Sequence, residues 1–404
     1  MDVSASPTQI GTRAGGARAA DERTQARAHR DKLKTWLLDR AFPLWWRAGA
    51  DHQRGGFHEA LDQAGRPLRA PRRARVQARQ TYAFALAGAL GWDGPWERAT
   101  EHGLAYVERC YRRPDGLYRT LLATDGSPLD DTAVLYDQAF VLFGQAAVFR
   151  AQPRRADALT SASDLCDRLH RDMKNRSGGF RSAAGLGGPL LSNPHMHLLE
   201  AALAWFEATG APSWKALARE IAALALTAFI DPNRGYLREA FSADWSPAPG
   251  TEGRIVEPGH QFEWAWLLMR WARIGGSSEA QSAAQRLIEI GEAAGSDARR
   301  GVAINALLDD FSLHDDGARL WPQTERIKAG AALAVATGDP RGWEIANRGA
   351  AALVRFLDTP IAGLWRDKMR SDGTFVEEPA PASSFYHIVC AVAELDRTLD
   401  EASG

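Results

Sequence analysis

Two kinds of helical pattern alternate along this chain. In the first kind, charged and apolar residues alternate at helical spacing, as in residues 156–173 and 341–357. The second kind is apolar on nearly every side, as in residues 194–209 and 382–399. An amphipathic helix covers a surface, whereas a helix that is apolar all round is buried. The predicted pairs, amphipathic helix first, are residues 22–47 and 71–90, 94–111 and 130–149, 156–173 and 194–209, 213–230 and 258–274, 277–294 and 321–337, and 341–357 and 382–399.

A short motif recurs between the two helices of each pair, a glycine followed by an aromatic residue or leucine. The copies are Gly55-Gly56-Phe57, Gly116-Leu117-Tyr118, Gly178-Gly179-Phe180, Gly235-Tyr236-Leu237, Asp316-Gly317 continuing to Leu320-Trp321, and Gly363-Leu364-Trp365. The average interval is about 60 residues, uneven only around the fifth copy, which is typical of a supersecondary repeat. We therefore predict an all-α fold, an (α/α)6 barrel formed by one domain over residues 22–400, preceded by a disordered tail over residues 1–21.

The connections differ in length according to their direction. Those from an outer to an inner helix are long, and several read as β-hairpins, such as residues 56–65 and 364–373. Those from an inner to the next outer helix are short, such as residues 210–212. All long loops with their short β-hairpins therefore fall on one end of the barrel. Function usually resides in such loops on a rigid scaffold, so this end is the expected active-site end.

Composition narrows the class of protein. The 404 residues carry 49 Lys and Arg against 50 Asp and Glu, so no electrostatic attraction to nucleic acid is expected. Three scattered cysteines fit a reducing cytoplasm rather than a disulfide framework or a zinc site. The longest uncharged apolar run, residues 82–90, is shorter than the roughly 18 residues of a membrane span. We expect a cytoplasmic protein that binds neither membrane nor nucleic acid; its oligomeric state stays open, and a homodimer is one alternative.

The segment of residues 257–266 carries the clearest candidate chemistry. Pro258 and Gly259 begin a helix, and His260 and Glu263 then lie three residues apart on one face. A histidine titrates near neutral pH, and a carboxylate one turn away can orient its ring and raise its basicity. Proton transfer in a cleft is the hypothesis. The alternative is a structural histidine at a helix start.

Polar residues occupy the first turns of all six predicted inner helices. They are Arg79, Tyr136 with Asp137, His197, His260 with Glu263, Trp321 with Glu325, and His387. Because these helices start at the same end of the barrel, the side chains should line one pocket. His195 points away from His197 on a helix, so we interpret His195 as structural.

The chain lacks the usual cofactor signatures. It has no P-loop, no dinucleotide-binding glycine motif in a strand-turn-helix setting and no nucleophile elbow. His197, His260, Glu263 and His387 have side chains that could bind a metal ion, but the chain has no HExxH-like signature. A metal site is therefore the less favoured alternative. We expect no metal and no cofactor.

Six segments in barrel order resemble the N-acylglucosamine 2-epimerase superfamily over about residues 33–395. They are Gly55-Gly-Phe57, Val76-Gln-Ala-Arg-Gln-Thr-Tyr82, Asn193-Pro-His-Met-His-Leu-Leu-Glu200, Pro258-Gly-His-Gln-Phe-Glu-Trp264, Leu320-Trp-Pro-Gln-Thr-Glu325 and Phe385-Tyr-His387. The family fold is the (α/α)6 barrel, which agrees with the repeat.

The resemblance implies roles for the matching residues. His260 and His387 are implied as the acid/base pair, with Glu263 beside His260. Arg79 and His197 are implied as ligands of sugar oxygens and Trp321 as a stacking wall. Glu325 is implied as a substrate-binding residue, through a sugar hydroxyl or through another residue of the site. A histidine with a pKa near 6.5 suits removal of the proton next to a carbonyl, and an arginine can stabilise the resulting cis-enediolate.

The resemblance also bears on the substrate. Disaccharide epimerases of the family typically have a Trp five residues before the last histidine, where this chain has Ala382. The context Ser383-Ser-Phe-Tyr-His387 is similar to the mannose isomerase branch. We therefore expect interconversion of unphosphorylated D-mannose and D-fructose, since neither an anion-binding loop nor clustered lysines occur; 2-epimerisation of an N-acylglucosamine or another aldose is the alternative.

Two other classes remain as rivals. A glycoside hydrolase on this barrel would use two carboxylates, for which Asp137, Glu263 and Glu325 are candidates. That reading leaves three in-phase histidines without a role. A sugar-binding or protein-binding barrel without catalysis is the other rival, and the presence of both His260 and His387 argues against it.

Overall fold

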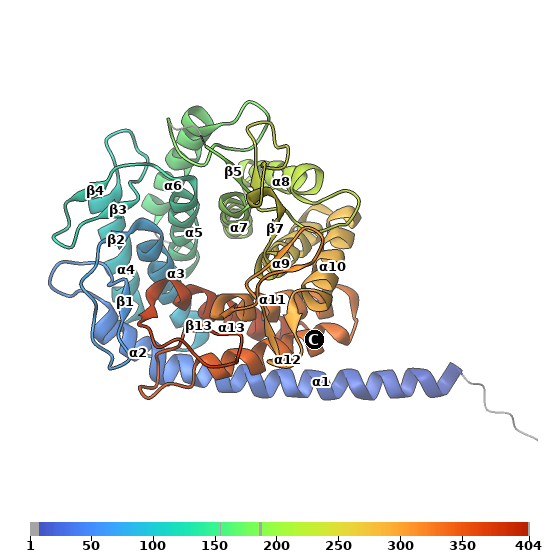
Figure 1. Cartoon of the computed structure of the whole chain (residues 1–404). Helices are drawn as coiled ribbons and strands as arrows, with labels where there is room; N and C mark the ends of the chain where they lie inside the picture. Colours follow the sequence, from blue (N-terminus) through green and yellow to red (C-terminus); the bar gives the residue numbers. More distant parts are fainter. Residues whose placement is uncertain (1–7, 154, 186–187, 403–404) are drawn as a thin grey trace, which may run out of the picture.

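The computed structural model describes residues 8–153, 155–185 and 188–402, with side chains from residue 20. Within these residues, long helices form two concentric rings (Figure 1). The inner ring consists of α3 (Ala74–Leu90), α5 (Leu135–Ala151), α7 (Ser192–Thr209), α9 (Pro258–Gly275), α11 (Leu320–Thr337) and α13 (Phe385–Glu401). The outer ring consists of α1 (Thr8–Trp36), α4 (Trp96–Tyr106), α6 (Ala156–Arg168), α8 (Pro212–Leu224), α10 (Ser278–Ala293) and α12 (Arg341–Phe356). The predicted all-α (α/α)6 barrel is confirmed.

Helix α1 runs without interruption through residue 22, the predicted start of the barrel domain (Figure 1). Residues 1–7 of the predicted tail lie outside the described residues. The domain limits of residues 22–400 therefore stay a prediction.

Four outer helices end in a wider, π-helical turn. These turns directly precede the glycine motifs, where the chain leaves the helix for the long loop. Their bounds are η1 (Leu37–Ala41) and η2 (Trp45–Gly49), separated by α2 (Phe42–Leu44), then η3 (Val107–Tyr111), η4 (Leu169–Met173) and η5 (Ala225–Phe229). Two short 3-10 turns, η6 (Glu252–Arg254) and η7 (Ala382–Ser384), lie in the loops.

The inner ring forms the core because its helices are apolar on every side. In α5, for example, the consecutive residues Phe140, Val141, Leu142 and Phe143 are all buried. Consecutive inner helices pack against each other, and α13 packs against α3. The ring is therefore closed, and its helix starts converge at one end.

Short strands tie the long loops of neighbouring repeats together at that end. Strand β1 (Ala60–Leu61) pairs with β14 (Ala380–Pro381), so the first loop is joined to the last. The other antiparallel sheets are β2 (Arg72–Arg73), β3 (Leu121–Leu122) and β4 (Pro128–Asp130); β5 (Leu190–Leu191) with β6 (Ala240–Phe241); β7 (Ile255–Val256), β10 (Ala306–Leu308) and β11 (Leu313–Asp315); β8 (Ser296–Asp297) with β9 (Val302–Ala303); and β12 (Ala318–Arg319) with β13 (Lys368–Met369).

In three repeats the glycine motif lies where the sequence predicted it, and a buried glutamine of the inner helix forms hydrogen bonds with its backbone. Gln77 accepts from the Phe57 N–H at 2.7 Å and donates to its carbonyl at 3.0 Å. Gln138 and Gln261 hold Tyr118 and Leu237 in the same way. Since buried backbone groups need partners, these side chains fix each loop on the barrel.

The fifth copy of the motif was misplaced. In the structure, Gln323 bonds the N–H and the carbonyl of Ala303, both at 2.9 Å, just after Gly301 with its positive φ of 71°. The equivalent motif is therefore Gly301-Val302-Ala303 and not Asp316-Gly317. This register makes the repeat nearly even and removes the irregular interval seen in the sequence.

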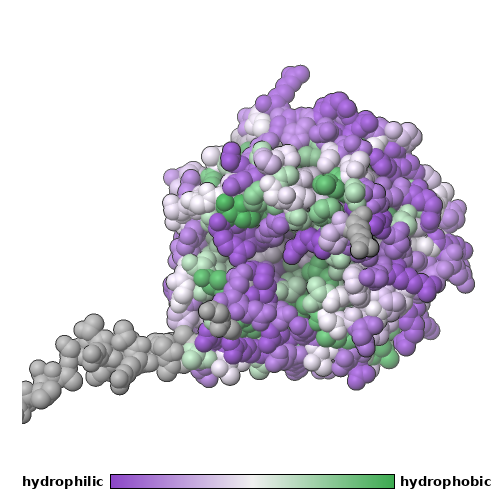
Figure 2. Space-filling model, turned by 180° about the vertical axis from the view of Figure 1, so that it is seen from behind, coloured by the Kyte–Doolittle hydropathy of each residue, from purple (hydrophilic) through white to green (hydrophobic). Residues whose placement is uncertain are grey.

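The opposite end of the barrel carries the short connections. Figure 2 shows this face, with a hollow among the ends of the inner helices where apolar residues are visible. The hollow is a cavity of about 380 Å³. Among its wall residues are Tyr82, Trp266 and Cys390. None of the described helices is long and apolar enough to cross a membrane.

Candidate active site

Helix α9 presents His260 in its first turn. Glu257 is extended, with φ −93° and ψ 115°, and Pro258 opens the helix. Gly259 is required by close packing, since a Cβ there would lie 2.4 Å from the ring of Trp321. The helix start at Pro258 and the close packing of Gly259 on Trp321 together place the rings of His260 and Trp321 side by side, with centroids 5.0 Å apart.

His260 is surrounded by carboxylates. Its Nδ1 atom lies 2.8 Å from Glu239 Oε2 and 3.6 Å from Glu257 Oε2. Burial disfavours the charged ring, but these two carboxylates outweigh burial and raise the pKa of His260 to about 10. His260 is therefore protonated at neutral pH.

The orienting partner of His260 differs from the one predicted. We expected Glu263 in that role because it lies one turn further along the helix. Its side chain turns instead toward His197 and Lys328, whereas Glu239 reaches His260 from the loop before β6. Helical spacing placed Glu263 on the correct face but could not show a carboxylate arriving from another segment.

His387, at the start of α13, is also held by a carboxylate, but burial and nearby cations shift its pKa in the opposite direction. Its Nδ1 atom lies 2.8 Å from Glu325 Oε1. Burial lowers the pKa of His387 well below 6.5, and the nearby charges of Arg79 and Lys328 act in the same direction. The ring is neutral at neutral pH. Its centroid lies 5.8 Å from that of Trp321, which therefore contacts both histidines.

No described residue forms a hydrogen bond with Nε2 of either histidine, whereas each Nδ1 is held by a carboxylate. This is the arrangement in which a second residue fixes the ring and leaves the other nitrogen for a substrate.

Arg79 lies on an aromatic surface, and its charge acts on His387. Its guanidinium donates to Tyr136 Oη at 2.7 Å and lies 4.1 Å from the ring centroid of Phe140. The side chain is 6% exposed, so its charge acts where water is largely excluded. The ring of Tyr136 in turn lies 5.1 Å from that of His197 between centroids, which places Tyr136 and Arg79 in the same group of side chains.

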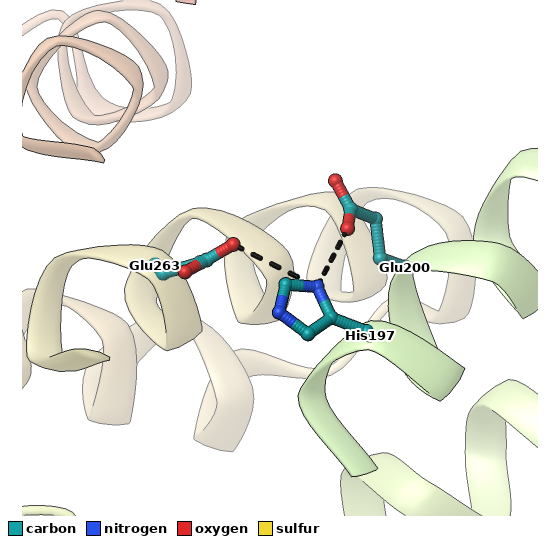
Figure 3. Close-up of side chains that lie close together, drawn as sticks. All are labelled: His197, Glu200 and Glu263. Carbon is teal, nitrogen blue, oxygen red and sulfur yellow. Dashed lines mark hydrogen bonds and ion pairs between the residues drawn. The ribbon is translucent and has the colours of Figure 1, made fainter. Parts of the chain in front are cut away.

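His197 forms part of a buried group with two carboxylates (Figure 3). Its Nδ1 atom lies 3.1 Å from Glu200 Oε2 and 3.9 Å from Glu263 Oε1. Burial lowers the pKa of His197 to about 4, so this ring is neutral. His195, by contrast, accepts from the Phe180 N–H at 2.9 Å and contacts the Leu191 carbonyl at 2.8 Å. The structural role predicted for His195 agrees with these contacts.

Asp137 was expected to line the pocket with the other polar residues, but its carboxylate is occupied by contacts within the fold. The side chain is fully buried, accepts from the Thr120 hydroxyl and pairs with Arg75 at 3.0 Å. Its oxygens hold the start of α3 against α5. Asp137 is therefore a structural residue.

Lys328 is the most important residue that the sequence reasoning missed. Its fully buried ammonium lies 2.5 Å from Glu325 Oε2 and 4.0 Å from Glu263 Oε1, and 3.8 Å from the ring centroid of Trp266. A lysine one turn after Glu325 in an otherwise apolar helix was the available signal. Glu200, Glu239 and Glu257 were missed as well, because the sequence does not show that their carboxylates reach His197 and His260.

Three groups of side chains in the described part of the chain have the donor types and spacing of a metal site. In each group the ligand atoms lie within 4.8 Å of one another. Two of the groups contain Glu263, and one of these also contains Glu325, to which the Lys328 ammonium already supplies a positive charge. The groups are His197 with Glu200 and Glu263, Glu239 with Glu257 and His260, and Glu263 with Glu325 and His387.

Comparison with known proteins identifies the family. The sequence model described as N-acylglucosamine 2-epimerase (GlcNAc 2-epimerase) matches residues 55–391. The chain belongs to this family. An N-acylglucosamine 2-epimerase family member is an isomerase or epimerase, which makes this protein an enzyme of that kind acting on a small sugar.

Individual members of the N-acylglucosamine 2-epimerase family show how close the relation is. A Rhizobium meliloti (strain 1021) protein named mannose-6-phosphate isomerase is 50% identical over 374 residues, 91% of this chain and 97% of that protein. The D-mannose isomerase of Thermobifida fusca is 30% identical over 369 residues, 82% and 85% of the two chains. The cellobiose 2-epimerase structure from Spirochaeta thermophila DSM 6192 is 23% identical, covers 95% of this chain and 99% of its own, and has a TM-score of 0.84, which shows the shared fold.

Proposed function

We propose that this enzyme interconverts an unphosphorylated aldose and ketose, D-mannose and D-fructose. One observation carries the proposal: His260 and His387 contact the same tryptophan ring, and their surroundings move their pKa values in opposite directions. Two titratable groups whose pKa values are shifted apart in this way can act as an acid and a base. The names of the Rhizobium and Thermobifida relatives point to the same type of reaction.

The proposed chemistry uses the two histidines in turn. Once the sugar ring is open, neutral His387 removes the proton on carbon 2, and protonated His260 donates a proton to the carbonyl oxygen on carbon 1. A cis-enediol forms. His387 then returns its proton to carbon 1, while the hydroxyl proton on carbon 2 goes back to His260, which leaves the ketose.

Arg79, Trp321 and His197 are the proposed substrate-binding residues. The guanidinium of Arg79 can stabilise negative charge on the enediolate oxygens, and it does so in a largely dry environment. The indole of Trp321 offers a flat apolar face between the two histidines on which a sugar can stack. Neutral His197 can hydrogen-bond a sugar hydroxyl.

The charges at the centre favour a neutral sugar. Glu200, Glu239, Glu257, Glu263 and Glu325 surround the histidines and outnumber the positive groups Arg79, Lys328 and His260, which disfavours a phosphate group. Of the arginines near this ring of acids, Arg75 is paired with Asp137 at 3.0 Å and Arg319 with Asp367 at 3.6 Å, and Arg79 is assigned above to the enediolate oxygens. We therefore propose mannose in preference to the mannose 6-phosphate in the name of the Rhizobium relative.

Ala382 supports a monosaccharide. It is fully buried in η7 and offers no aromatic wall for a second sugar. A cytoplasmic location is part of the proposal and is supported by the three free thiols Cys110, Cys166 and Cys390.

Proton exchange tests the function. The enzyme is incubated with mannose in deuterated water, and carbons 1 and 2 are followed by NMR. We expect fructose with deuterium on carbon 1. Formation of glucose without fructose would show that the enzyme is a 2-epimerase and not an isomerase. Turnover of mannose 6-phosphate but not of mannose would overturn the choice of a neutral substrate.

A further inference from the structure

A polar cavity lies on the rim of the barrel, apart from the central histidines. Its volume is about 500 Å³, and its walls come from residues 47–58, residues 67–72 and the tip of the β3–β4 hairpin. In Figure 1 these are the blue and teal segments around β1, β2 and β4, and the pairing of β2 with β3 brings them together. None of the central histidines, Arg79 or Trp321 belongs to its wall.

This rim cavity is strongly basic. Its wall contains four arginines against two aspartates, and two histidines that can add further positive charge. The basic residues are Arg47, His52, Arg54, His58, Arg69 and Arg72. The wall therefore carries an excess of two positive charges even when both histidines are neutral.

The base of the rim cavity is rigid. Arg72 is buried, pairs with Asp51 and donates to the Gly55 carbonyl at 2.8 Å. Asp51 also accepts from the backbone N–H groups of Gln53 and Arg54, at 3.1 Å and 3.0 Å. This network fixes the turn that carries Arg54, and the carboxylate of Asp51 neutralises the charge of Arg72.

The other three arginines of the rim cavity keep their charge available. Arg47, Arg54 and Arg69 are exposed, and among the residues described their side chains form no ion pair. The pKa of the half-buried His58 is lowered by burial and by Arg72, Arg54 and Arg69, which outweigh Asp51. Asp125, also in the wall, acts electrostatically on Arg54 and offsets one of these charges, so the cavity keeps an excess of two positive charges.

We propose that the rim cavity binds a phosphate monoester, with a phosphorylated sugar as the ligand class. Guanidinium groups bind phosphate oxygens through paired hydrogen bonds, and three unpaired arginines around one cavity provide them. The volume accommodates a monosaccharide together with its phosphate. The central site is acidic and the rim cavity basic, so the two sites select ligands of opposite character.

Isothermal titration of the whole chain at low ionic strength tests the proposal. The probes are inorganic phosphate, glucose 6-phosphate and uncharged glucose. We expect one saturable site for each phosphate compound, weakened by salt, and none for glucose at this cavity. Arg54→Ala combined with Arg69→Ala should weaken phosphate binding about tenfold or more. Arg176→Ala, an exposed arginine in another loop, is the matched control and should change nothing.

Absence of saturable phosphate binding would overturn the proposal. So would equal binding by the wild type and the double variant, because the anion would then sit elsewhere. Both arginines are exposed, and a circular dichroism melt of each variant verifies that the fold is intact.

Discussion

Glu239 holds the ring of His260, with Oε2 lying 2.8 Å from Nδ1. The two residues come from different parts of the fourth repeat, Glu239 from the loop before β6 and His260 from the first turn of α9. Because Glu257 approaches the same nitrogen at 3.6 Å, the imidazolium has two negative neighbours. This contact explains why His260 is positioned as the acid of the proposed pair.

Removing the charge of Glu239 should change the pH profile. In Glu239→Gln we expect the pKa of His260 to fall from about 10 toward 6.5, so the alkaline limb of kcat moves to lower pH. Glu279→Gln, an exposed carboxylate on α10, is the control. Measurement of kcat against pH checks the shift, and an unmoved alkaline limb would remove His260 from the role of acid.

The same pair should make stability depend on pH. Since the folded pKa of His260 is raised, its stabilising contribution is fully present below the ordinary value of 6.5 and is lost as pH rises toward about 10. Thermal melts across this window should show a loss of stability in the wild type, smaller in Glu239→Gln. An equal loss in both proteins would contradict the assigned cause.

Both histidines should be required for turnover. We expect His260→Ala and His387→Ala each to lower kcat by about 100-fold to 10,000-fold, the usual contribution of a general acid or base. His314→Ala, an exposed histidine in β11, should keep full activity. Steady-state kinetics with thermal melts separate catalysis from unfolding. Activity near that of the wild type in either central variant would refute the assignment.

Lys328 should stabilise the fold and keep His387 neutral. Lys328→Met leaves Glu325 and Glu263 without their ammonium, and breaking a buried ion pair in this way costs about 3–5 kcal/mol. Loss of this positive charge should also raise the pKa of His387, so the acid limb of kcat/KM moves toward neutral pH. Urea unfolding and a pH profile measure the two effects.

A double variant provides the control for Lys328. Lys328→Met combined with Glu263→Gln removes one charge of each sign and should recover part of the lost free energy of unfolding. If the double variant is as unstable as the sum of the two single variants, the two charges do not interact.

Metal removal should leave the rate unchanged. Lys328 already supplies a positive charge beside Glu325 and Glu263, and the two histidines carry out the proposed proton transfers. Dialysis against EDTA followed by a kinetic assay checks this. A rate that falls and returns on addition of Zn²⁺ or Mn²⁺ would place an ion in one of the three His and carboxylate groups.

The sequence by itself determined the barrel and its polar end. Helical periodicity separated buried from amphipathic helices, and short and long connections alternated, so the helix starts that carry Arg79, His260 and His387 had to meet at one end. Local spacing was sufficient because a closed ring of repeats places equivalent residues at equivalent depths.

Only the tertiary structure decided which side chains touch. It assigned Glu239 rather than Glu263 to His260, buried Asp137 against Arg75, and placed Lys328 among carboxylates from several helices. These contacts join residues far apart in the chain, and a pKa depends on the charges within a few ångströms rather than on sequence neighbours. The acid and base characters of the two histidines could therefore be distinguished only once the ring was closed around them.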